Sequence, residues 1–115
     1  MDVDHRKLVD LFNLLGEGIS NRKGKEFCVR ILDEIIELGK TNFELEDKLM
    51  TAHRYPKGEE HSAKHATMME RALSYRNNLD VDAAGAYMAL VHFAEVWLCY
   101  HIIFFDKELA RFLAR

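Results

Sequence analysis

Residues 55–65 have the sequence Tyr55-Pro56-Lys57-Gly58-Glu59-Glu60-His61-Ser62-Ala63-Lys64-His65, which predicts a turn followed by a helix with two histidines one turn apart. Side chains four residues apart leave the same face of an α-helix, so both imidazoles should point in one direction. Met68 and Ala72 fall on that face as well, which makes it the face expected to pack against the core.

Two imidazoles in an apolar interior need partners for their ring nitrogens, because leaving them unpaired would cost about 1–3 kcal/mol each. A metal ion bound by His61 and His65 would satisfy both at once. An exposed pair, or two core histidines bonded to neighbouring groups, would fit the same spacing. The spacing of these two residues alone therefore does not decide between a metal site and ordinary histidines.

Length and composition predict a single domain, residues 1–115, with a core of its own. A net charge of −3 with scattered Lys and Arg argues against a nucleic-acid surface, and the apolar stretches are too interrupted for a membrane span. No signal peptide is visible. Cys28 and Cys99 are expected to be reduced, half-buried residues of a cytoplasmic protein.

Apolar residues spaced by three and four predict four helices and no strands. The expected ranges are 4–15, ended by Gly16 and Gly18, then 22–52 with Ser20-Asn21 as caps, and 58–76. The fourth helix is expected to be capped by Asp80 or Asp82 and to run through Leu90, Ala94, Trp97 and His101. Gly39 weakens the second helix by about 1 kcal/mol relative to alanine.

Polar residues interrupt two of these apolar stripes. Asn42 and Glu46 lie on the core-facing side of the second helix, where a carboxylate is costly unless it is paired or bound to metal. A slight rotation of the helix, with Glu46 reaching solvent, is the alternative. Asp106 lies five residues after His101, about 140° away on an α-helix, so it is either exposed or turned inward by a break near residues 104–105.

Four helices with short connections predict an all-α, antiparallel up-down four-helix bundle. In such a bundle, the starts of odd helices and the ends of even helices meet at one level. His5 opens the first helix and Glu46 lies late in the second, while His61 and His65 open the third and His101 lies late in the fourth. This convergence favours a metal site. His53 and His92 are expected to be surface residues outside it.

The sequence resembles the hemerythrin family, in particular its bacterial single-domain members, over nearly the whole chain. The matching blocks are His5-Arg6-Lys7-Leu8 with Asn13, Phe43-Glu44-Leu45-Glu46-Asp47-Lys48-Leu49-Met50, Tyr55-Pro56 through His61 and His65, and Trp97-Leu98-Cys99-Tyr100-His101-Ile102-Ile103-Phe104-Phe105-Asp106. The last block is highly specific when it follows the paired histidines.

The resemblance implies a bundle that holds two iron ions, with an oxo or hydroxo bridge, and binds dioxygen at one of them. It implies that three imidazoles hold the first iron, those of His61, His65 and His101. Glu46 and Asp106 would bridge the ions and His5 would bind the second. The oxygen pocket would be lined by Leu8, Phe43, Trp97, Leu98 and Ile102.

Two departures from the family pattern stand out. A fifth histidine normally precedes the phenylalanine of the second block, but here that position is Asn42. The second iron should therefore have one imidazole in place of two, with the Asn42 carbonyl or water as a weaker substitute. Only four residues precede His5, so the arm that normally packs near the ligand-bearing ends is missing.

The sequence thus favours a non-haem diiron protein that binds dioxygen or a related small molecule for storage, delivery or sensing. A diiron oxidase or peroxidase-like enzyme is the first alternative, since a lost imidazole opens a coordination position. An interaction bundle with a partial metal site is the second. Iron and manganese are not separated by these ligand types.

Overall fold

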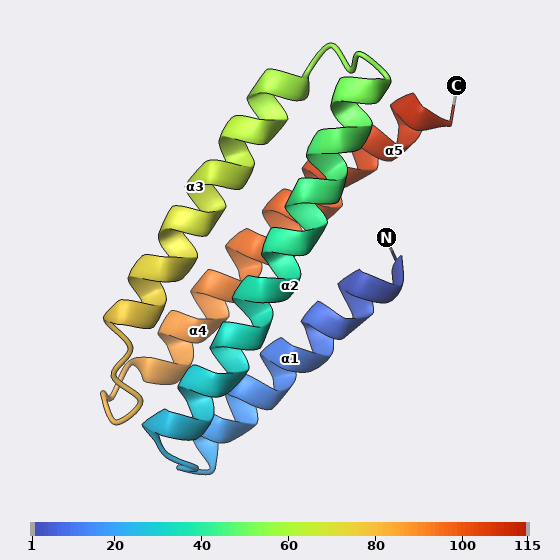
Figure 1. Ribbon diagram of the computed structural model, residues 1–115. Coiled ribbons are helices and arrows are strands. Elements are labelled where there is room, and N and C mark those ends of the chain that lie inside the picture. The colour runs from blue at the N-terminus through green and yellow to red at the C-terminus, as the bar shows by residue number, and fades with distance from the viewer. Residues whose placement is uncertain (1, 115) are drawn as a thin grey trace.

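The computed structural model of the chain describes residues 2–114. For residues 2–4, 99–100 and 102–104 it describes the helix but not the surroundings of the side chains. All regular secondary structure among the described residues is helical and none is strand, which confirms the all-α prediction. Its elements are α1 (Asp2–Ser20), α2 (Lys25–Ala52), α3 (Gly58–Asn77), α4 (Ala86–Ala94), the π-helix η1 (Glu95–Asp106) and α5 (Lys107–Leu113). Figure 1 shows α4 continuing through η1 into α5 as one long column.

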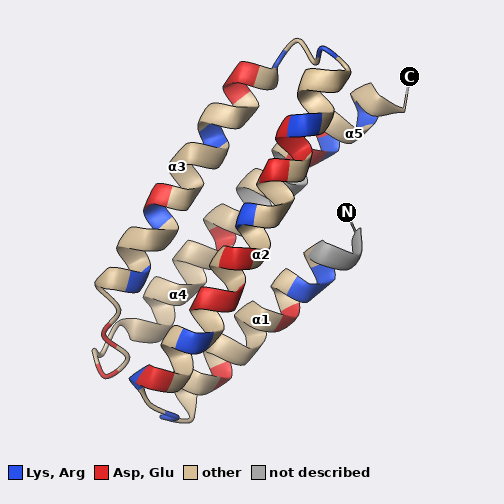
Figure 2. Cartoon of the chain, in the orientation of Figure 1, with Lys and Arg blue, Asp and Glu red and all other residues tan. Residues whose placement is uncertain are grey.

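The helices pack in a ring around one core. α1 contacts α2, α2 contacts α3, α3 contacts η1, and α4 closes the ring on α1. Phe12, Phe93 and Trp97 form an aromatic cluster inside it, with ring centroids 5.6–6.3 Å apart. Charged residues of both signs are distributed along α1, α2 and α3 (Figure 2).

The first helix is longer than expected, because Gly16 and Gly18 do not end it. α1 continues to Ser20, and both glycines are buried within it. A β-carbon at position 18 would lie 2.8 Å from the ring of Phe27, so this glycine allows α1 and α2 to approach closely. The prediction that Ser20-Asn21 caps the second helix is also wrong: α2 begins after Gly24, which has a positive φ of 94° and makes no side-chain cap bond.

The fourth column begins later than predicted. The carboxylate of Asp80 accepts a bond from the backbone N–H of Asp82 at 3.1 Å, so it stabilises a local turn instead of capping a helix. The residue before α4 is Gly85. Cys28 is fully buried, not half-buried, and is a free thiol, while the side chain of Cys99 lies outside the described set. No helix among the described residues is long and apolar enough to cross a membrane.

Candidate metal centre

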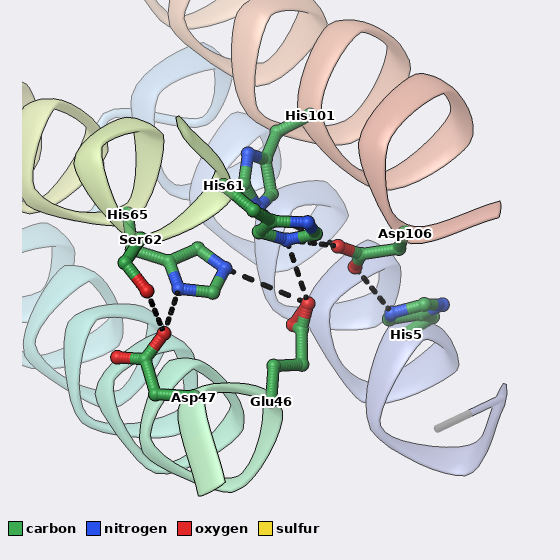
Figure 3. Close-up of polar contacts among 8 residues, drawn as sticks. All are labelled: His5, Glu46, Asp47, His61, Ser62, His65, His101 and Asp106. Atoms are coloured by element: carbon green, nitrogen blue, oxygen red, sulfur yellow. Dashed lines mark hydrogen bonds and ion pairs between the residues drawn. The ribbon is translucent and has the colours of Figure 1, made fainter. Parts of the chain in front are cut away.

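Five of the six predicted ligands meet in the interior of the molecule. α2 supplies Glu46, α3 supplies His61 and His65, and η1 supplies His101 and Asp106 (Figure 3). Each offers one nitrogen or oxygen, and these five atoms all lie within 4.8 Å of one another. All five residues are at most 4% exposed, so the cluster is closed off from bulk water. We call it the five-residue cluster.

The imidazoles of the cluster are turned towards the carboxylates. His61 Nε2 lies 3.2 Å from Glu46 Oε1 and 3.3 Å from Asp106 Oδ1. His65 Nε2 lies 3.5 Å from the same Glu46 oxygen, and His101 Nε2 lies 3.5 Å from the same Asp106 oxygen. Three nitrogens and two oxygens therefore surround one point, the arrangement in which a cation would contact all of them.

None of these five converging atoms has a hydrogen-bond partner among the described residues. A buried polar atom without a partner costs about 1–3 kcal/mol, and more when it is charged. Imidazole and carboxylate together suit first-row transition metals such as iron. A metal ion would satisfy all five atoms at once, so the residues present fit such an ion.

The π-helix resolves the open question about Asp106. A π-helix closes its hydrogen bonds between residues i and i+5, whereas an α-helix closes them between i and i+4. Residues five apart therefore come close to the same face, and His101 and Asp106 are both buried in the cluster. The expected alternatives were exposure or a helix break. Neither occurs, because η1 changes the helical period without interrupting the helix.

His5 lies at the edge of the five-residue cluster. Its Nε2 is 3.3 Å from Asp106 Oδ2, the oxygen that does not face His61 and His101. Its side chain is 24% exposed, in contrast to the five buried residues of the cluster. Asp106 therefore presents one carboxylate oxygen to two buried imidazoles and the other to His5.

Asp47 contacts a histidine of the cluster, a role that the spacing of residues along the sequence does not predict. Its Oδ1 lies 3.1 Å from His65 Nδ1 and accepts a hydrogen bond from the Ser62 hydroxyl at 2.7 Å (Figure 3). A carboxylate on the outer ring nitrogen fixes the orientation and tautomer of a ligating histidine. The spacing of Ser62 and His65 on one helix was visible, but their partner on α2 was not.

Apolar rings cover the cluster on the side of the core. Phe43 stacks on His65 with ring centroids 4.1 Å apart, and Trp97 stacks on Phe43 at 5.7 Å. Leu8 is buried, whereas Leu98 is half-buried in the wall of a groove between α1 and α4. The side chain of Ile102 lies outside the described set. The assignment of these five residues to an oxygen pocket stays a prediction.

The remaining candidates are more exposed than the residues of the five-residue cluster. Asn42 is half-buried on α2, one turn before Glu46. His53 and His92 are exposed, as expected of surface residues. Neither belongs to the group of buried ligand atoms.

Burial and the neighbouring charges shift the pKa values of the cluster residues in different directions. Burial lowers the pKa of His61, but the neighbouring Asp106 and Glu46 outweigh burial and raise it to about 9. Burial holds the pKa of His101 at about 4, although Asp106 opposes that shift. Burial alone would raise the pKa of Asp106, yet His5 and His61 keep it well below its usual range. Without metal, a proton on His61 therefore balances part of the carboxylate charge.

The comparisons with known proteins give one match. A family model described as the hemerythrin HHE cation-binding domain matches residues 1–113 of the 115-residue chain. The match covers every helix of the structure and every predicted ligand from His5 to Asp106. The search of curated proteins and the search of solved structures return no match.

Proposed function

Because the chain belongs to the hemerythrin HHE cation-binding domain family, we propose that it is a non-haem diiron protein that binds dioxygen or a related small molecule. Storage, delivery and sensing are the roles that suit such binding. The proposal includes an antiparallel up-down bundle formed by α1, α2, α3 and the α4–η1–α5 column as a single domain. One observation carries it: five buried donor atoms converge on one point, and they lack hydrogen-bond partners in the part of the chain that the structure describes.

The ligands divide into an inner and an outer group. His61, His65 and His101 would hold the first iron, and His5 would hold the second. Glu46 and Asp106 would bridge them. For Asp106 the support is its two oxygens, which face the buried imidazoles on one side and His5 on the other.

Iron in this cluster would supply the electrons and the open coordination position that dioxygen binding requires, with an oxo or hydroxo bridge between the ions. The chain's own residues do the rest. Phe43 and Trp97 exclude water on the core side, which limits proton access to a bound ligand. Asp47 holds the ring of His65 in a ligating orientation.

An oxidase or peroxidase-like activity is the second candidate, and Asn42 favours it. A neutral amide oxygen is a weaker donor to iron than imidazole, so the second ion would keep an open or water-filled position. Open positions favour turnover over reversible binding. The Asn42→His variant separates the two functions: it should hold closer to two irons per chain and bind oxygen for longer than the parent. A parent with two irons that releases oxygen intact would exclude the enzyme.

Metal analysis and a visible spectrum of freshly purified protein test the metal centre itself. His61→Ala should lose most of the bound metal, because it removes an inner ligand. His92→Ala is the matched control, since this exposed histidine lies outside the five-residue cluster. Equal metal loss in both variants, or no metal in the parent after loading with Fe²⁺, would contradict the proposal.

A further inference from the structure

A polar cavity lies directly beside the five-residue cluster. Its volume is about 250 Å³, and it is lined by His61, four charged side chains and two aromatic rings: Lys57, Glu60, Lys64, Glu108, Tyr55 and Phe105. His61 is only 2% exposed and turns its Nε2 towards Glu46 and Asp106. The imidazole of His61 therefore stands between the cavity and the cluster.

Two acidic and two basic side chains line this cavity, and one acid is paired with one base. Lys57, just before α3, forms an ion pair with Glu108 on α5, and this pair joins two elements that border the cavity. The Lys64 ammonium lies over the ring of Phe105, 5.8 Å from its centroid. Glu60 supplies a second carboxylate to the lining. Both acids and both bases thus line the space next to His61.

On the core side of the cluster, the described residues offer aromatic rings in place of charged groups. Phe43 and Trp97 are buried there and stack on one another and on His65. Moving an ion out of water costs several kcal/mol even after relaxation, so a hydrated cation would not cross aromatic packing. A polar cavity lets the ion keep part of its water shell and exchange the rest for carboxylate oxygens.

We infer that the cavity beside His61 is the route by which a hydrated divalent cation enters the five-residue cluster. Glu60 and Glu108 attract the cation, and the Lys57 ammonium repels it and occupies Glu108. The Lys57 side chain is 57% exposed, and exposed ion pairs are weak and open readily. The pair therefore controls the rate of entry and not the affinity of the centre. This inference rests on the proposed metal centre.

The test measures uptake of Co²⁺ by metal-free protein, followed by visible absorption after rapid mixing. Lys57→Gln should load about fivefold faster at low ionic strength, and the gain should shrink as salt screens the charges. Its equilibrium affinity for Co²⁺ should equal that of the parent, since Lys57 is not a ligand. The double variant Lys57→Gln/Glu108→Gln should lose the gain, because it removes the freed carboxylate too.

Arg76→Gln is the matched control. Arg76 pairs with Asp33 and so joins α3 to α2, but it lies in the last turn of α3, away from the cavity. This variant should load at the parental rate. An unchanged rate for Lys57→Gln, or an equal gain for Arg76→Gln, would overturn the entry route. Failure of the parent to bind Co²⁺ at equilibrium would instead overturn the metal centre on which the route depends.

Discussion

Gly39 of α2 lies against the indole of Trp97 so closely that a β-carbon at position 39 would be 2.9 Å from Cη2 and nearer still to Cζ2. Trp97 is fully buried, with Phe12, Phe43 and Phe93 around it, so its ring has little room to move. From the sequence alone, Gly39 is expected only to weaken the helix. The close contact gives the physical reason for a glycine at position 39: it leaves room for the indole of Trp97, which stacks on Phe43.

The first prediction follows from that contact. Gly39→Ala should lower the free energy of unfolding by up to about 2 kcal/mol, because overpacking costs about 1–3 kcal/mol whereas alanine gains only about 1 kcal/mol over glycine in a helix. Thermal unfolding and the emission of the single tryptophan, Trp97, would report it. Gly16→Ala is the control, since its β-carbon would meet its neighbours at 3.6 Å or more and should stabilise α1. A Gly39→Ala protein as stable as Gly16→Ala would contradict the prediction.

The second prediction concerns the carboxylate behind His65. Asp47→Ala removes the acceptor of His65 Nδ1 and should weaken metal binding about 10–100-fold. Asp47→Asn keeps an acceptor but loses the charge, so it should fall between Asp47→Ala and the parent. Competition with a coloured chelator for Co²⁺ would measure the affinities. Glu44→Ala, an exposed acid on the same helix, should leave the affinity unchanged, and a loss there would show that any nearby charge suffices.

The third prediction is a pH dependence of the metal-free protein. His61 has a pKa of about 9 when folded, above its ordinary 6.5, so its proton stabilises the metal-free fold. That contribution is fully present below pH 6.5 and is lost as pH rises to about 9. Chemical unfolding without metal should therefore show stability falling across this window. His61→Gln should flatten the fall and His92→Gln should keep it; a flat parental profile would refute the assignment.

The fourth prediction couples metal to stability. Metal at about a hundred times its dissociation constant should add about 2.7 kcal/mol to the free energy of unfolding, because the unfolded chain does not assemble the cluster. Thermal unfolding with and without a chelator would show the difference. A protein proven to carry metal, yet with the same midpoint after chelation, would argue against a buried centre.

Much of the fold follows from local patterns in the sequence. Pro56 separates α2 from α3. The apolar stripes place Glu46 and His61 on inward faces, and both side chains are buried in the structure. Gly18 was misread because glycine has two uses: it can end a helix or permit close packing. Only the position of Phe27 on α2 distinguishes them.

Two features of the site depend on information that a helical period does not carry. The contact of Asp47 with His65 joins different helices, and which face of α2 meets α3 is set by packing. The burial of Asp106 depends on η1, whereas the periodicity argument assumes an α-helix throughout. The resemblance to hemerythrins supplied Asp106 as a ligand, but the reason lies in the helix type.

The π-helix also links the spacing of His101 and Asp106 to the type of helix that carries them. An α-helix would bring a histidine and a carboxylate together at a separation of four residues, and η1 does so at five. A chain with one residue fewer in this segment and an ordinary helix would present the same pair of ligands. The five-residue spacing of His101 and Asp106 therefore depends on the wider helix. A mutation that converted η1 into an α-helix would turn Asp106 away from the five-residue cluster without changing any of its five residues.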